Sequence, residues 1–393
     1  MADAHRAHRI RARRRDGATV TPLELFFDLV FVLAITQCSS LMESGHGWRT
    51  VGQGVLVLGV LWWSWVGYAW LTSVVDPDDG VVRLVMFVAM AAMLVVALCV
   101  PEAFDDRALG LTLAGAYAVV RTAHIGLFVI ASEDDPLLRR SVIGLAFGSA
   151  VGVSLVAFAA LCDGWVQGLL WAVALAFDMA VPFVFGSEGW HLEPAHFAER
   201  HGLIVLIALG ESIVALGIGT SVGLTAGVVA AAVLGVALAA AMWWSYFDVG
   251  SMLAARRLIE MPPGQEQNEA ARDGYSLLHF PIVAGIVLVA FALEHVLGHV
   301  TEPLDSVGAV VLGGELALFL LGQVASKRRL TGTIARQRVV PAVLLMVAIP
   351  VFDRVDAWLS LSIAAVVMWA LVAWEVRQYR DVRDEIRGWD GAR

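Results

Sequence analysis

Apolar segments long enough to cross a lipid bilayer recur through almost the whole chain. A membrane-spanning helix needs about 20 consecutive apolar residues, and twelve segments of about this length are separated by short polar stretches. They lie at 22–42, 51–74, 83–101, 109–131, 141–162, 165–186, 195–219, 224–247, 275–297, 306–326, 339–353 and 357–376. The segment 339–353 is the weakest, because it is short and contains Pro341 and Pro350. The pattern predicts an all-α polytopic membrane protein with about twelve transmembrane helices.

Composition excludes the soluble alternative. Hydrophobic residues make up 59% of the chain and charged residues 16%, against about 25% charged in ordinary globular proteins. The lipid bilayer is therefore the first predicted partner, and a net charge of −9 gives no reason to expect nucleic acid. The three cysteines, Cys38, Cys99 and Cys162, lie in or beside apolar segments at no metal-ligand spacing. We expect neither a metal nor a cofactor.

The distribution of arginine predicts the orientation. Cytoplasmic segments of membrane proteins are enriched in Lys and Arg. With twelve spans and a cytoplasmic N-terminus, 22 basic residues fall inside, among them the sole lysine Lys327, and only Arg49, Arg107 and Arg354 fall outside. We expect both termini in the cytoplasm and the protein in the bacterial inner (plasma) membrane. Residues 1–20 then form a basic N-terminal segment, which has no cleavable signal, and residues 377–393 form the C-terminal tail.

An internal repeat is predicted from three matched stretches. Residues 60–65 (VLWWSW) recur at 241–246 (AMWWSY). Residues 84–100 align with 277–293 without a gap, and residues 26–37 align with 200–211. The chain is thus predicted to consist of two parallel six-helix repeats, 21–190 and 191–376. Transported solutes commonly bind where such halves meet.

Ionisable residues inside the predicted spans are the candidate site. A charge at the centre of a span costs about 2.5–3.5 kcal/mol, so these groups should face protein or water. Glu24 and Asp28 share one face of the first span, and we expect them to pair with Arg121 or Arg200. The predicted substrate or ion site comprises Glu24, Asp28, Arg121, His196, Glu199, Arg200 and Glu211. Secondary candidates are Gln37, Tyr117, His124, His201, His279, Glu294 and Glu315.

Two of these acids suggest proton coupling. Glu211 and Glu315 lie at mid-depth with no basic residue nearby in sequence, and a buried carboxylate without a partner takes up a proton near neutral pH. The hypothesis assigns proton coupling to Glu211. Arg121 and Arg200 would neutralise the acids of the first span or an anionic solute. A static ion-pair network that fixes helix register is the structural alternative.

Catalytic motifs are missing from the sequence. Residues 196–201 (HFAERH) differ from the His-Glu-x-x-His pattern of zinc proteases, and at helical spacing His196 and His201 point away from each other. There is no phosphate-binding loop, no GxSxG elbow and no CxxC pair. We do not expect an enzyme, and no residue is assigned a catalytic or metal-binding role.

Several motifs carry a family resemblance. They are 21–32 (TPLELFFDLVFV), 34–37 (AITQ), 196–202 (HFAERHG), 208–213 (ALGESI) and 279–281 (HFP). With these motifs the chain resembles the bacterial low temperature requirement A (LtrA) family of multi-pass membrane proteins over about residues 20–380. The resemblance implies a membrane protein linked to growth in the cold, without a defined substrate.

A looser resemblance concerns the first span. Residues 26–28 (FFD), followed by an apolar helix that ends in 34–36 (AIT), are similar to the opening helix of two-repeat lysosomal-type potassium channels. Those channels carry Phe-Ser-Asp where this chain has FFD at 26–28. The second half of this chain has RHG at 200–202 and lacks the aspartate. This resemblance implies a cation channel lined by the first and seventh spans.

The predicted function is a transporter or permease with an ionisable site at the junction of its two halves. The alternatives are a cation channel and a non-transporting scaffold or sensor of cold or lipid stress. The longest predicted loop, 248–274, is too short for a separate signalling domain, which argues against a sensor. The sequence leaves open the solute or ion, the direction, the coupling ion, the pathway and whether the protein is a homo-oligomer.

Overall fold

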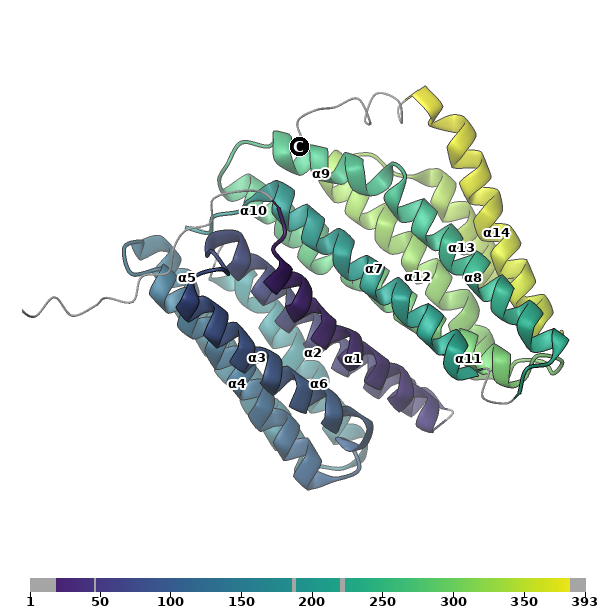
Figure 1. The fold of residues 1–393 in the computed structure, drawn as a ribbon, viewed down its shortest axis with the longest axis horizontal. Helices are drawn as coiled ribbons and strands as arrows, with labels where there is room; N and C mark the ends of the chain where they lie inside the picture. Colours follow the sequence, from purple (N-terminus) through teal and green to yellow (C-terminus); the bar gives the residue numbers. More distant parts are fainter. Residues whose placement is uncertain (1–18, 46, 186–188, 220–222, 382–393) are drawn as a thin grey trace, which may run out of the picture. The chain divides into compact units, whose positions relative to one another are not determined.

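A computed structural model describes residues 19–45, 47–185, 189–219 and 223–381, and in these ranges the chain is all-helical (Figure 1). Its long helices are α1 (Pro22–Ser44), α2 (Trp48–Val74), α3 (Gly80–Cys99), α4 (Arg107–Ala131), α5 (Pro136–Ala159), α6 (Gly164–Val184), α7 (Pro194–Gly219), α8 (Ala226–Phe247), α11 (Phe280–Gly298), α12 (Ser306–Thr331), α13 (Arg336–Phe352) and α14 (Ala357–Gln378). Shorter elements are η1 (Val100–Glu102), α9 (Gly250–Glu260), α10 (Gln265–Ala271) and the π-helix η3 (Arg272–Leu277).

The twelve predicted spans coincide with the twelve long helices, which confirms the all-α membrane fold. In the described ranges, eleven candidate spans are long and apolar enough to cross a membrane. The twelfth long helix, α13, has only 17 residues and contains Pro341 and Pro350. At 1.5 Å per residue it is about 26 Å long, slightly shorter than the roughly 30 Å hydrocarbon core. The two repeats and the orientation of the termini stay predictions.

Large apolar side chains on the helix exteriors identify the lipid-facing surface. Leu84, Ile143, Val233 and Val347 are each more than 60% exposed, and they lie on α3, α5, α8 and α13. Water would penalise so much exposed apolar area at about 25 cal/mol per Å². These faces are therefore in contact with the acyl chains of the bilayer.

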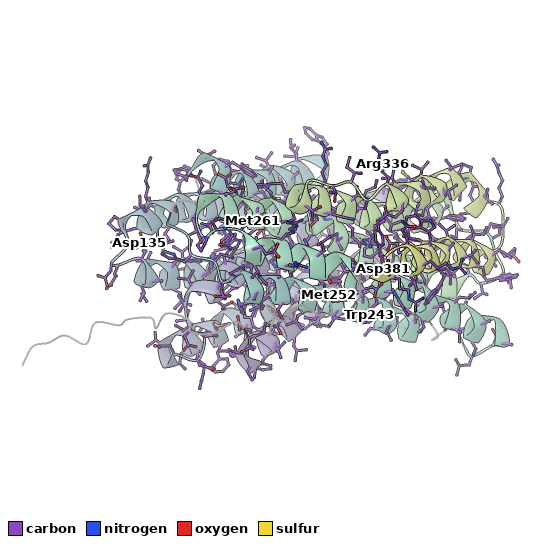
Figure 2. All side chains as sticks on the ribbon, turned by 90° about the horizontal axis from the view of Figure 1, so that it is seen from above. Asp135, Trp243, Met252, Met261, Arg336 and Asp381 are labelled. Atoms are coloured by element: carbon purple, nitrogen blue, oxygen red, sulfur yellow. The ribbon has the colours of Figure 1, made fainter. Side chains whose placement is uncertain are left out.

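The segment 248–274, predicted to be a loop, is largely helical, so that prediction is wrong. Helix α9 has the sequence GSMLAARRLIE and buries Ala254 and Leu258, which are four residues apart. On its charged side, Nε of Arg256 donates a hydrogen bond to Glu260 one turn later, at 2.7 Å. Figure 2 labels Met252, in the first turn of α9, and Met261, the residue that follows its last turn. Because only one side of α9 is apolar, its hydropathy is too low to predict a span.

Several helix ends are capped by side chains. Asp79, Asp106, Asp135 and Asp305 accept hydrogen bonds from backbone N–H groups at the starts of α3, α4, α5 and α12. The N–H of Leu138 lowers the pKa of Asp135, and nearby His191 adds to the effect. These caps fix where each helix begins, just outside the apolar segment.

The described chain divides into two compact units. Unit 1 comprises the chain up to Ala34, Val60–Phe197 and Pro263–Asn268. In it α4 packs against α3 and α5, and α5 packs against α6. Its core includes a run of rings in which Tyr68 contacts both Phe27 and His124.

Unit 2 comprises Ile35–Gly59, Ala198–Pro262 and the chain from Glu269 onward. Helix α11 lies at its centre, because it packs against α8, α12 and α14 and buries 13 of its 19 residues. Helix α12 is also enclosed, since it contacts α9, α11, α13, α14 and η3. Polar groups on α11 and α12 are therefore shielded from lipid by their neighbours.

The π-helix η3 requires a glycine at a close approach to α12. A Cβ built on Gly274 would lie 2.7 Å from both Cγ and Cδ2 of Leu330. We expect Gly274→Ala to lower the free energy of unfolding by about 1–3 kcal/mol through overpacking. Thermal unfolding in detergent measures this change. Gly115→Ala on α4 is the matched control, because its Cβ would meet nothing within 4 Å. Equal melting temperatures for the two variants would contradict the packing account.

Candidate functional site

Glu24 closes the first turn of α1. Its Oε2 accepts hydrogen bonds from the backbone N and the hydroxyl of Thr21, at 2.9 and 3.0 Å. In return the N–H of Glu24 donates to the Thr21 hydroxyl at 3.4 Å. This reciprocal arrangement is a capping box, and Pro22 occupies the first helical position, where proline is favoured. One oxygen of Glu24 therefore has a structural role.

The other oxygen of Glu24 joins α1 to α7. Its Oε1 lies 2.8 Å from Nε2 of His196, and both side chains are fully buried. Nδ1 of His196 is 3.3 Å from the hydroxyl of Ser73 on α2. Residues 24, 73 and 196 thus form one polar cluster inside unit 1. Ser73 has no sequence signal that distinguishes it from other serines in spans.

The capping box gives a first test of this cluster. Thr21→Ala removes the hydroxyl that both accepts from and donates to Glu24, so we expect a loss of about 1 kcal/mol in unfolding free energy. Thermal unfolding in detergent is the measurement. Thr112→Ala on α4 is the control, because the Thr112 hydroxyl bonds only to its own helix, at Ala108. If both variants melt at the wild-type temperature, the capping box does not stabilise α1.

Asp28 lies on the same face of α1, one turn further along, as predicted. The indole N–H of Trp65 donates to its Oδ1 at 2.8 Å. Trp65 ends the Trp-Trp-Ser-Trp motif of α2 and is 1% exposed. The motif was singled out as a repeat marker, and its last tryptophan is a direct partner of a candidate acid.

Of the two arginines expected to pair with the acids of the first span, Arg121 has a different partner, whereas pairing with Arg200 stays a prediction. The ion-pair partner of Arg121 in the described ranges is Asp178 of α6, at 3.0 Å, and both side chains are at least 96% buried. Nε of Arg121 also donates to the hydroxyl of Ser149 on α5 at 3.0 Å. Arg121 and Asp178 both lie near the middle of their predicted spans, 109–131 and 165–186, and this similar position explains the pair. The arrangement ties α4, α5 and α6 together.

Two secondary candidates accompany Arg121 on α4. Tyr117 is buried. His124 is buried between rings, 5.2 Å from the centroid of Tyr68 and 5.0 Å from that of Phe128. Neither ring nitrogen of His124 has a hydrogen-bond partner among the described residues. His124 therefore serves as packing in the core of unit 1.

Glu211 is a buried acid held by a hydroxyl. The Thr36 hydroxyl donates to its Oε2 at 2.6 Å, and both residues belong to unit 2. Glu211 is 1% exposed, and within the part of the chain that the structure describes it has no ion-pair partner. Gln37, next to Thr36, is half-buried.

Glu315 is more isolated still. It is 2% exposed, and neither carboxylate oxygen has a hydrogen-bond partner in the described residues. Its position on α12 faces α11, because Gly285 of α11 approaches the Glu315 carbonyl and Gly322 of α12 approaches Ile282. The secondary candidate Glu294 is half-buried near the end of α11.

Aromatic and imidazole rings form a second polar cluster in unit 2. The His279 ring stacks on Tyr275 at 4.7 Å and lies 5.4 Å from His201. Nδ1 of His279 is 2.9 Å from the Gly274 carbonyl, which must accept, so Nδ1 carries a proton. Nε2 lies 3.0 Å from the Tyr246 hydroxyl, which can donate or accept. In the neutral ring, these contacts select the tautomer with the proton on Nδ1.

The remaining candidates of α7 differ in burial. Arg200 is fully buried in unit 2, whereas Glu199 is exposed. His196 and His201 have different neighbours, Glu24 for the first and the tyrosine cluster for the second. Within the ranges described, no group of three or more His, Cys, Asp or Glu side chains could hold a metal ion.

One buried ionic cluster was missed by the sequence analysis. Arg338 of α13 pairs with both oxygens of Glu375 of α14, at 2.7 and 3.0 Å. It also donates to Gln323 of α12 and, at 2.7 Å, to the carbonyl of Ser245 on α8. Arg338 directly precedes the predicted span 339–353 and is one of the 22 basic residues assigned to the cytoplasmic side. The one available signal was opposite charges at neighbouring ends of the last two spans.

The motifs at these clusters lead to the family. The family described as bacterial low temperature requirement A protein (LtrA) matches residues 19–373, most of the chain. The chain belongs to the LtrA family. This LtrA protein is 28% identical over 396 residues to the "Uncharacterized protein RA0937" of Rhizobium meliloti (strain 1021), covering 98% of this chain and 95% of that protein. No solved structure matches it.

The LtrA motifs have structural roles in this chain. The Thr-Pro-Leu-Glu start of the first motif forms the capping box of α1. His196 opens the second motif and contacts Glu24 of the first. His279 begins the third and holds the π-helix through the Gly274 carbonyl. Glu211, by contrast, is in hydrogen-bond contact with Thr36 alone among the residues that the structure describes.

Proposed function

We propose that this LtrA protein is a proton-coupled transporter of a small solute, with Glu211 as the group that binds and releases the proton. The observation that carries the proposal is the state of Glu211. It is buried in a membrane-spanning helix and its described contact is a hydroxyl, not a cation. An ionised carboxylate would be costly there. Burial favours the protonated form of Glu211, and the neighbouring Thr36 hydroxyl can hydrogen-bond to the carboxyl group in either protonation state. These two properties are those of a group that binds and releases a proton reversibly.

The buried charged residues Glu24 and Arg121 have partners within the protein, so we assign them structural roles and exclude them from proton coupling. Arg121 is neutralised by Asp178, and Glu24 is engaged by Thr21 and His196. Removing either partner of a buried pair leaves an uncompensated charge. We therefore assign these residues to folding, and assign proton coupling to unit 2.

A flux assay in reconstituted vesicles tests transport. Proteoliposomes loaded with a pH-sensitive dye are challenged with pools of amino acids, organic acids, sugars and alkali cations. We expect at least one pool to change the internal pH faster than in protein-free vesicles, with a rate that saturates with concentration. Glu102→Gln is the control variant, because Glu102 is an exposed acid of η1. Its flux should equal that of the wild-type protein.

Two other results would refute the carrier. Unitary current steps in a planar bilayer would identify a channel, in line with the looser resemblance of the first span. No flux above protein-free vesicles for any pool, from protein that is folded and monodisperse, would favour the scaffold or sensor.

A further inference from the structure

A cavity lined by both apolar and polar residues lies in unit 2, and Glu211 is not part of its lining. Its volume is about 80 Å³, enough for several water molecules or one small ion, since a water needs roughly 10–15 Å³ by this measure. Its polar lining includes Tyr246, His279, Gln323, Lys327, Arg338 and Glu375, from five different long helices or their ends.

Most polar groups of the lining are already satisfied. Arg338 uses four of its five N–H donors on Glu375, Gln323 and the Ser245 carbonyl. Glu375 accepts at both oxygens from Arg338. Both nitrogens of His279 are engaged, as described above. These groups build the cavity and have little capacity left for a ligand.

The unused groups are donors. Arg338 donates to Oε1 of Gln323, which fixes the orientation of that amide. Nε2 of Gln323 then has no partner in the described residues, although the side chain is 6% exposed. Lys327 lies over the Tyr379 ring at 5.7 Å and has no ion pair within the described ranges. The Nε2 donor of Gln323 is buried and therefore requires an acceptor. Lys327 is half-buried and adds a cation to the same cavity.

Helix α9 adds positive potential to the same space. Gly250 and Ser251, its first two residues, line the cavity. The preceding residue, Val249, supplies no side-chain cap, and an anion is favoured by the positive end of a helix dipole. Asp248 also lines the cavity but is half-exposed at the end of α8. Its negative charge disfavours multiply charged ligands.

From these observations we infer that the cavity binds a small oxyanion, of the carboxylate or phosphate class, between Nε2 of Gln323, the Lys327 ammonium and the first turn of α9. The site does not depend on the proposed transport, because binding can be measured in detergent without flux. The negative charge of Asp248 favours a monovalent carboxylate over phosphate.

The single lysine allows a direct test. Lys327 is the only lysine in the chain, so an amine-selective acylating reagent labels this side chain and the N-terminus alone. We expect acetate or phosphate to slow labelling of Lys327 about tenfold at ten times its Kd, relative to chloride at equal ionic strength. The N-terminal amine is the internal control, and peptide mass spectrometry gives both rates. Protection by acetate, phosphate or both identifies the class. Equal rates in all three salts would overturn the site.

A matched pair of variants tests the geometry. Gln323→Glu keeps an acceptor for Arg338 but replaces the free donor with a negative oxygen, so anion protection of Lys327 should be lost. Gln378→Glu adds the same charge at the exposed end of α14, and in this variant the anion should still protect Lys327 from labelling. If Gln323→Glu is protected like Gln378→Glu, the amide does not bind the anion and the assignment is wrong.

A second variant covers the case in which Gln323→Glu fails to fold. Lys327→Met removes the charge without touching Arg338. Its melting temperature in chloride should be close to that of the wild type, while the rise produced by acetate or phosphate should disappear. A full anion-dependent rise in Lys327→Met would overturn the inference.

Discussion

Arg121→Met is expected to lower the free energy of unfolding by about 3–5 kcal/mol, because it leaves Asp178 as an uncompensated charge between α4, α5 and α6. The pair is short, at 3.0 Å, and at least 96% buried. Ser149, which donates or accepts as needed, cannot replace a cation. Thermal unfolding of the purified protein in detergent measures the loss.

Two further variants distinguish loss of the Arg121–Asp178 ion pair from non-specific destabilisation of the fold. Arg107→Met breaks the exposed pair of Arg107 with Asp163, which is 3.3 Å long, and should cost less than about 1 kcal/mol. The double variant Arg121→Met with Asp178→Leu replaces both charges with apolar groups and should recover most of the stability. If the single variant melts like wild type, the pair is not a structural tie. If the double variant is the least stable of all, charge compensation is not what holds these helices.

Glu211→Gln is expected to reduce solute-driven proton flux to the level of protein-free vesicles. The amide resembles the protonated acid in shape and can still accept from Thr36, so the fold should be kept. It cannot release a proton. Exchange of solute across the membrane without net proton movement should continue, because exchange does not require the acid to change its protonation state.

Substitution of Thr36, the hydrogen-bond partner of Glu211, should have a milder effect than Glu211→Gln. Thr36→Val removes the hydroxyl that donates to Glu211 at 2.6 Å but leaves the carboxyl in place. We expect proton coupling to persist with an altered pH dependence. Loss of exchange together with coupling in Glu211→Gln would mean that the residue binds solute or stabilises the fold, and the coupling assignment would be withdrawn.

The spans could be predicted because burial in lipid depends mainly on length and composition. Every predicted segment matched a long helix, and even the weakness of 339–353 corresponded to the short helix α13. The segment 248–274 could not be predicted in this way. Helix α9 is held by Ala254 and Leu258 on one side only, and that pattern is weak over 11 residues.

The position of an ionisable residue along its helix could be predicted from the sequence, whereas its partner could not. Arg121 was placed at mid-membrane, but hydropathy does not tell which neighbouring helix turns an acid toward it, and the partner was Asp178. The role of Glu24 was available from sequence, because Thr21-x-x-Glu24 has capping-box spacing. The partnership of Arg338 with Glu375 depends on the ends of α13 and α14 meeting, which only the fold determines.

The central claim is that Glu211 carries an exchangeable proton, and infrared spectroscopy of the reconstituted protein measures it most directly. A protonated carboxyl has a carbonyl stretching band that an ionised carboxylate lacks. We predict a band at neutral pH that disappears at alkaline pH and is missing from Glu211→Gln, but is retained in Glu102→Gln. Comparison with Glu315→Gln assigns any second band to the other buried acid. A spectrum of Glu211→Gln identical to that of the wild type at every pH would contradict the claim, because Glu211 would then never bind a proton.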